Sequence, residues 1–287
     1  MNTLSRRNCE TEPKTAEQIN RMRKAGLYVW HALQIAKANV KPGITTGEID
    51  RQIERFFDDI KAVSLFKGFP GIVPYPAVTC ISVNEEVVHG IPGKKKLEEG
   101  DIVSVDTGCK VLDLGSKTLG WCGDAAATFP VGDISEEARR LIDVTRQVLQ
   151  LAIDEIPKCN LWSEVGRKME EFVKRYRFSV VESHVGHGIG RELHEVPQVP
   201  NYYCSEFVNK GDFVLKPGTV IAVEPMVNAG TKRVRMLGDH WTIITSDRKL
   251  SAHFEHTLAI TASGVKILTG PPATENEKID ISPYILL

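Results

Sequence analysis

Several features that would assign this chain to a special class are missing from its 287 residues. Its six cysteines form no C-x-x-C pair, which argues against a disulfide framework or a structural zinc site. Lys+Arg (36) and Asp+Glu (37) nearly balance, so the basic excess typical of nucleic-acid-binding proteins is absent. No apolar run approaches the roughly 18 residues of a membrane span. The first fourteen residues have no apolar core, so we expect no secretory signal, a cytoplasmic location and reduced thiols.

The composition that remains is that of an ordinary globular protein, with 42% apolar and 25% charged residues. Capping-box patterns predict helices that begin near Thr15 and Thr45, and apolar periodicity predicts two more over about 135–156 and from about 163. Strand-like runs lie at 78–83, 102–105, 125–129, 178–181, 220–223, 241–245 and 257–260. The predicted order is therefore two helices followed by strands, twice over.

The two halves of this pattern also resemble each other in sequence. EIDRQIERF at 48–56 aligns with EVGRKMEEF at 164–172, which lies 116 positions later. LEEGDIVSVD at 97–106 aligns with LKPGTVIAVE at 215–224, which lies 118 positions later. Two matches in the same order at nearly one offset favour an internal duplication over two unrelated pairs of amphipathic segments.

A duplication of this kind predicts a metal site, because both equivalent strands end in a carboxylate. Pairing the halves would bring Asp106 and Glu224 together, and facing carboxylates repel unless a cation or a proton lies between them. Asp124, Glu255 and His187 also lie in apolar or glycine-rich stretches, where unpaired charge is costly. Carboxylates with one imidazole suit Mn, Fe, Co or Zn, and two such ions can activate water and polarise a carbonyl.

Six motifs, taken together and in order, resemble those of the type I methionine aminopeptidases from about residue 15 to 270. They are NEEVVHGIP (84–92), GDIVSVD (100–106), GDAAAT (123–128), GHGIGR (186–191), VEPMVN (223–228) and SAHFEHT (251–257). The resemblance implies an α+β pita-bread (creatinase/aminopeptidase) fold, in which a curved antiparallel sheet is backed by pseudo-two-fold-related helix pairs. It also implies removal of the initiator methionine from nascent proteins and peptides that begin with Met.

The same resemblance implies a role for each site residue and two divalent ions (Co, Mn, Fe or Zn) per chain. Asp106, Asp124, His187, Glu224 and Glu255 would be the ligands, with Asp124 and Glu255 bridging both ions. Glu224 would also carry a proton from the attacking water to the leaving amine. His194 would donate to the scissile carbonyl, and His89 would hydrogen-bond the substrate backbone.

The methionine pocket and one hairpin depart from the family pattern. Tyr75, Cys80, Leu193 and Trp241 fall at pocket positions, although Leu193 replaces a frequent Phe, and Ile72 and Val73 replace a Tyr-His pair. We expect these apolar residues to preserve a pocket for the thioether. Asp106 and Asp124 lie 18 positions apart, about seven more than the family usually has, and the extra residues near 112–118 have turn composition. Asp113 is an alternative first ligand, which we disfavour because its surroundings match neither the family nor the repeat.

We expect one catalytic domain over 15–270, with halves of about 15–132 and 133–270, a polar extension over 1–14 and a tail over 271–287. Another pita-bread peptidase of the X-Pro type is disfavoured, because those enzymes carry a large additional N-terminal domain. The type II enzymes carry a long helical insertion between the histidine and the first glutamate ligand, whereas only 37 positions separate His187 from Glu224. A non-catalytic binding protein on the same fold remains an alternative, although all five candidate ligands are present. We expect a monomer that associates transiently with the ribosome and binds neither nucleic acid nor membrane.

Overall fold

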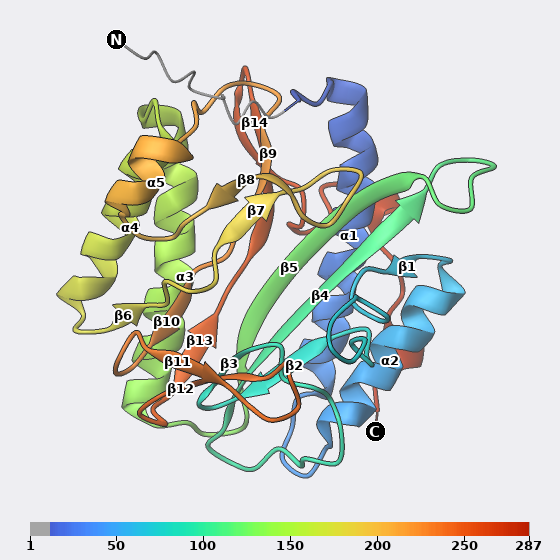
Figure 1. Ribbon diagram of the computed structural model, residues 1–287. Coiled ribbons are helices and arrows are strands. Elements are labelled where there is room, and N and C mark those ends of the chain that lie inside the picture. The colour runs from blue at the N-terminus through green and yellow to red at the C-terminus, as the bar shows by residue number, and fades with distance from the viewer. Residues whose placement is uncertain (1–11, 287) are drawn as a thin grey trace.

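Two helices followed by antiparallel strands occur twice along the chain, in the order predicted from the sequence (Figure 1). The computed structural model describes residues 12–286. Residues 1–11 of the predicted extension over 1–14 therefore lie outside the described residues. The helices are α1 (Ala16–Asn39), α2 (Thr46–Asp59), α3 (Glu136–Glu155), α4 (Trp162–Arg175) and α5 (Ser205–Lys210), with short 3-10 turns at 156–158, 275–277 and 282–284. Within the described residues, none of these helices combines the length and the apolar character needed to cross a membrane.

The strands lie between the two helix pairs, and all their pairings are antiparallel (Figure 1). Before α3 come β1 (Val63–Ser64), β2 (Cys80–Val83), β3 (Glu86–Val88), β4 (Ile102–Leu112) and β5 (Gly120–Pro130). After α4 come β6 (Ser179–Val180), β7 (Gly186–Gly188), β8 (Glu195–Val199), β9 (Val220–Val223), β10 (Met226–Asn228), β11 (Val234–Met236), β12 (Ile243–Thr245), β13 (Ser251–His253), β14 (His256–Thr261) and β15 (Gly264–Ile267). The sheet orders are β1-β4-β2 with β5 on β4, β15-β14-β9-β7-β8, β13-β10-β6 and β11-β12-β3.

The predicted elements are confirmed, with differences at their ends. The strand predicted over 220–223 is β9, residue for residue. The predictions over 102–105 and 125–129 are too short, because β4 and β5 pair along eleven residues each and include glycine and polar positions. Short strands such as β7 and β13 have no run of β-formers, and only their pairing partners define them.

The same backbone hydrogen bonds recur before α2 and before α4. The Leu97 N–H donates to the Ile44 carbonyl at 2.8 Å, and the Leu215 N–H donates to the Asn160 carbonyl at 2.9 Å. In a second matching pair of bonds, the Thr46 N–H donates to the Lys95 carbonyl at 2.9 Å, and the Trp162 N–H donates to the Phe213 carbonyl at 3.1 Å. Leu97 and Leu215 begin one pair of aligned segments, and the other positions lie just outside the aligned segments at the same offsets of 116 and 118, so the internal similarity extends from residues to contacts.

Each helix pair packs against its own apolar core. Ile53 and Phe56 of α2 lie with Val105 of β4 in one cluster, which also receives α1. Leu141 of α3 and Trp162 of α4 lie with β9 and β14 residues in a second cluster. A third, smaller cluster joins the two and includes Tyr75, Cys80, Trp121 and Leu193. The junction between the two halves is therefore partly apolar, and the candidate site lies beside it.

The C-terminal residues after β15 cover the α1–α2 pair. The buried Asn39 amide donates to the Tyr284 carbonyl at 2.8 Å, and its oxygen accepts from the Leu286 N–H at 2.7 Å. The Tyr284 ring packs edge-on against Phe56, and its hydroxyl donates to Asp59 at 2.8 Å. The predicted tail over 271–287 is thus tied to the helices along its described residues.

Candidate metal centre

A cavity of about 330 Å³ opens where strands from the two halves meet. All five predicted ligands line this cavity: Asp106, Asp124, His187, Glu224 and Glu255. The predicted His89, His194, Tyr75, Cys80, Leu193 and Trp241 line it as well. Residues that are up to 180 positions apart in the sequence therefore share one pocket.

The β4–β5 hairpin places both aspartates on one side of the ladder. Asp106 pairs with Ala126, and Asp124 pairs with Gly108, so each aspartate lies two positions from the other's partner. Side chains two residues apart on paired strands share a face, which brings the two carboxylates together. A Cβ atom on Gly108 would lie 2.9 Å from Asp124 Oδ1, so a glycine opposite Asp124 leaves room for its carboxylate.

The other three side chains come from short segments of the second half. His187 lies on β7, Glu224 directly follows β9, and Glu255 lies between β13 and β14. The Glu255 N–H donates to the Ala126 carbonyl of β5 at 2.9 Å, which fixes this residue against the first half. The cavity therefore depends on a backbone bond that crosses between the halves.

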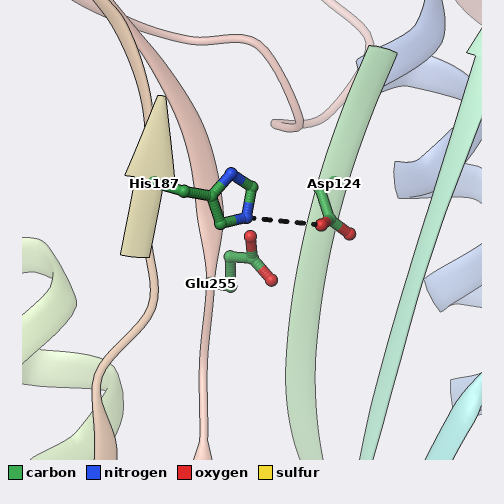
Figure 2. A group of neighbouring side chains, drawn as sticks. All are labelled: Asp124, His187 and Glu255. Carbon is green, nitrogen blue, oxygen red and sulfur yellow. Dashed lines mark ion pairs between the residues drawn. The ribbon is translucent and has the colours of Figure 1, made fainter. Parts of the chain in front are cut away.

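Three of the side chains converge closely, as Figure 2 shows. Asp124, His187 and Glu255 each offer one ligand atom, and these atoms lie within 4.8 Å of one another. His187 Nε2 lies 3.9 Å from Asp124 Oδ2 and 3.5 Å from Glu224 Oε1. One imidazole nitrogen thus faces several carboxylate oxygens in a buried space.

The electrostatics of the cavity favour a bound cation. Burial first, and then the neighbouring carboxylates, raise the pKa of Asp106 and Glu255 well above the usual range, and burial raises that of Asp124 to about 7. One buried oxygen on each of these three side chains has no hydrogen-bond partner. Buried carboxylates without partners are costly unless they coordinate a metal or take up a proton.

His187 is held as a neutral ligand. Burial, followed by the neighbouring His194, lowers the pKa of His187 to about 4. Its Nδ1–H donates to the Gly188 carbonyl at 2.9 Å, since a carbonyl oxygen only accepts. The lone pair of Nε2 therefore points to the carboxylates, in the tautomer that a metal ligand requires. The donor set fits hard to borderline divalent cations.

Two further histidines form the wall beside these residues. The His194 ring lies 4.5 Å from the His187 ring at nearly a right angle, and 5.5 Å from Phe69. His89 has a left-handed backbone (φ 59°), and burial lowers its pKa to about 4. Both rings line the cavity, so both can reach a bound substrate.

The apolar wall differs in part from the sequence prediction. Tyr75 is fixed because its hydroxyl is within reach of the Thr79 and Gly90 carbonyls, at 3.1 and 3.0 Å. Trp241 packs edge-on against Tyr75 at 5.1 Å. The prediction that Ile72 and Val73 line the pocket is wrong: they are 81% and 53% exposed, and Phe66 and Phe69 line it instead. The Trp241 ring lies against Gly71, where a Cβ would meet it at 2.5 Å, so the chain turns outward there.

Some cavity residues carry little signal in the sequence. Val88, Ser183, His184 and Val185 also line the cavity, and so does His253, whose buried Nε2 has no hydrogen-bond partner. His184 and His253 each lie within three positions of a predicted ligand, and His253 also lies within the motif SAHFEHT.

Asp113 does not line the cavity, so the alternative in which it replaces Asp106 as the first ligand is wrong. It directly follows β4, and its carboxylate forms ion pairs with Arg21 and Arg191.

Known proteins are similar to this chain over most of their length. A profile of Metallopeptidase family M24 matches residues 20–262. Methionine aminopeptidase 1 of Bacillus subtilis is 44% identical over 256 residues, covering 89% of this chain and 98% of that protein. Methionine aminopeptidase of Escherichia coli is 42% identical over 259 residues, covering 89% of this chain and 92% of that protein.

Solved structures agree with the expected architecture. The methionine aminopeptidase of Thermotoga maritima superposes with a TM-score of 0.81 at 41% identity, covering 91% of this chain and 99% of that one. A prolidase from Pyrococcus furiosus superposes with a TM-score of 0.66 at 23% sequence identity, covering 91% of this chain and 66% of the prolidase chain. This likeness concerns the fold alone. The α+β pita-bread fold expected from the sequence is confirmed.

Proposed function

The chain belongs to metallopeptidase family M24, and on this basis we propose that it is a methionine aminopeptidase, which removes the initiator methionine from proteins and peptides. The observation that carries this proposal is the buried group of Asp124, His187 and Glu255, with unpaired carboxylate oxygens around a neutral imidazole nitrogen. Relatives that match about nine-tenths of the chain at 42–44% identity are named for this activity.

Five side chains would hold two divalent ions of the Mn, Fe, Co or Zn type: Asp106, Asp124, His187, Glu224 and Glu255. In this assignment Asp106 and Asp124 of the first half and His187, Glu224 and Glu255 of the second half would each supply ligand atoms to the ions. When bound, such ions lower the pKa of water and polarise a carbonyl group. The unpaired oxygens described above support this assignment, because each still needs a positive partner.

The residues around the ligands have separate tasks in this proposal. His194 donates a hydrogen bond to the scissile carbonyl oxygen as negative charge develops on it, which requires only a neutral ring. His89 hydrogen-bonds the substrate backbone next to the scissile bond. Glu224 accepts a proton from the attacking water and gives it to the leaving amine, a role that suits a carboxyl group whose pKa is raised by burial.

The apolar wall of the cavity would bind the methionine side chain. Phe66, Phe69, Tyr75, Leu193 and Trp241 offer aromatic and aliphatic surface, and thioethers contact such rings favourably. Cys80 lies among them with its thiol buried, and burial raises the pKa of that thiol. We place the enzyme in the cytoplasm as a monomer that meets nascent chains at the ribosome.

The test is a metal titration with a Met-Ala-Ser peptide. Purified protein stripped of metal is supplied in turn with Mn, Fe, Co and Zn, and free methionine is measured. We expect release of methionine with at least one ion, and about two ions bound per chain by elemental analysis.

Two controls separate the alternatives. A peptide with proline in the second position after a residue other than Met should stay intact; its cleavage in preference to Met-Ala-Ser would favour an X-Pro peptidase. Tight binding of Met-Ala-Ser without hydrolysis under every ion would favour a non-catalytic protein.

A further inference from the structure

The loop of the β4–β5 hairpin, residues 113–119, begins with a carboxylate that turns back to the protein. It extends from the tip of the hairpin in Figure 1. Its backbone is closed by the Asp113 N–H, which donates to the Leu119 carbonyl at 2.8 Å. Leu114 at its tip is fully exposed, whereas the Asp113 side chain is only 22% exposed. The loop therefore has an outer part that contacts nothing and a base that contacts the rest of the chain.

Arg191 forms most of the contacts at this base. Its Nη1 donates to Asp113 Oδ2 and, at 3.1 Å, to the Gly120 carbonyl. The centre of its guanidinium lies 3.9 Å from the centre of the Trp121 ring, a stacked position that Arg suits better than Lys. The hydrogen bond from Arg191 lowers the pKa of Asp113, so this carboxylate stays charged at neutral pH.

Arg191 belongs to a segment that no regular ladder supports. Strand β7 ends at Gly188 and β8 begins at Glu195, and between them lie Leu193 and His194, which both line the cavity. The segment is attached by separate bonds: the Cys122 N–H donates to the Gly190 carbonyl at 2.9 Å, the Ile189 N–H to the Val220 carbonyl at 3.3 Å, and the Arg191 N–H to the Glu195 carboxylate at 2.7 Å. Its position therefore depends on such individual contacts, to which the Arg191 side chain adds those at the hairpin.

We infer that Asp113 and Arg191 are positioning residues, which hold the segment 189–194 so that His194 reaches the scissile carbonyl. This inference rests on the proposed aminopeptidase activity. Asp113 does not line the cavity, and in this inference it acts through Arg191, three positions before His194. A displacement of about 1 Å at a reacting group is enough to lower the rate strongly.

The experiment compares Asp113→Asn with the wild type at saturating metal. We expect kcat to fall about tenfold and KM to change less than about twofold, because most of the methionine pocket comes from other segments. Asp113→Glu keeps the charge and should recover most of kcat.

Arg21→Gln is the matched control, since it removes the other ion pair of Asp113 (3.2 Å) and leaves Arg191 in place. It should leave kcat within about twofold of the wild type. An equal loss in Arg21→Gln and Asp113→Asn would overturn the inference in favour of general anchoring of the hairpin.

A double variant tests whether the effect passes through His194. In a His194→Ala background, Asp113→Asn should change kcat by less than about twofold, because the group that it positions is already absent. Losses that multiply instead would overturn the inference.

Hydrogen exchange provides a readout that does not need activity. Backbone amides over 189–194 should exchange faster in Asp113→Asn than in the wild type, while those of β4 and β5 stay unchanged. Unchanged exchange over 189–194 would overturn the inference even if the enzyme is active. A wild-type protein that releases no methionine would overturn the proposed function instead, and exchange would still report on the positioning.

Discussion

The two halves contribute to the cavity by different means, although their helices begin with the same backbone contacts. The first half contributes Asp106 and Asp124 from one hairpin whose strands pair along eleven residues. The second half contributes His187, Glu224 and Glu255 from three separate segments, beside strands of three to six residues. A continuous ladder holds its carboxylates by itself, whereas short segments depend on contacts from elsewhere, such as the bond from Glu255 to Ala126. The two halves therefore provide equivalent acids, Asp106 and Glu224, and differ in how the neighbouring ligands are held.

The largest expected effect comes from removing one ligand from each half. Asp124→Ala and Glu255→Ala should each lower turnover more than about 100-fold, since even residues that merely orient ligands contribute 10- to 100-fold. Both should fold, and in metal-free protein neither should lower Tm, because each removes a buried carboxylate that repels its neighbours. Methionine release and thermal unfolding measure the two effects.

Glu206→Gln serves as the control for this pair, because Glu206 lies exposed on α5 outside the cavity. It should retain full activity. Full activity in Glu255→Ala would remove Glu255 from the site and leave each half with two candidate ligands, Asp106 and Asp124 against His187 and Glu224.

A second comparison concerns the C-terminal segment, which covers only the α1–α2 pair. Asn39→Ala should destabilise the protein by about 2–3 kcal/mol, because it leaves the buried Tyr284 carbonyl and Leu286 N–H without partners. Denaturant unfolding measures this free energy. Gln150→Ala, which removes an exposed amide on α3, should change it by less than about 0.5 kcal/mol. Equal changes in the free energy of unfolding for Asn39→Ala and Gln150→Ala would show that the C-terminal segment does not stabilise the α1–α2 pair.

A third comparison uses the equivalent N-cap residues of α2 and α4, which directly precede the two helices. The Thr45 hydroxyl accepts from the Glu48 N–H at 3.2 Å, whereas Leu161, 116 positions later, has no hydroxyl to offer. Thr45→Leu should cost about 1 kcal/mol of the free energy of unfolding, and Leu161→Thr should add about 0.5 kcal/mol. Thermal unfolding of both variants measures these changes in stability. If both variants shift the stability in the same direction, Thr45 and Leu161 do not have equivalent roles as N-caps.

The smallest expected effect is a pH dependence in the first half. Burial, and to a lesser extent the nearby Arg23 charge, lower the pKa of His31 below its unfolded value of 6.5. The neutral ring donates to the Leu27 carbonyl at 2.7 Å and accepts from the Ile279 N–H at 3.0 Å. Its contribution to stability is therefore complete above pH 6.5 and is lost as the pH falls below that value.

The measurement is Tm between pH 8 and pH 5 for the wild type and for His31→Gln. The difference in Tm between the two should shrink as the pH falls, because only the wild type loses the contribution of a neutral imidazole. A constant difference across this range would contradict the assignment.

Local patterns predicted much of the fold. The capping boxes at Thr15 and Thr45 predict the first two helices, because the hydrogen bonds that start a helix form between residues three positions apart. The strand over 220–223 ends before Glu224 as expected. Two equivalent acids, Asp106 and Glu224, already indicated a cation site, since carboxylates that face each other need a positive partner. The prediction that both acids end their strands is wrong for Asp106, because β4 continues past it to Leu112.

Other parts could not be predicted, because they depend on which distant segments meet. The sequence shows Ile72 and Val73 as apolar, but in the folded chain they are exposed, and Phe66 and Phe69 form the wall. It shows Asp113 as one more acid near the ligands, and only the folded chain gives it Arg191 as a partner.

The sequence by itself determined the order of helices and strands and the set of candidate ligands, because these follow from neighbours a few residues apart and from an internal repeat. The tertiary structure alone decided the walls of the cavity, the burial of the carboxylates and the course of the C-terminal segment. Burial and packing are properties of surfaces from remote parts of the chain, and their energies exist only once those surfaces are in contact.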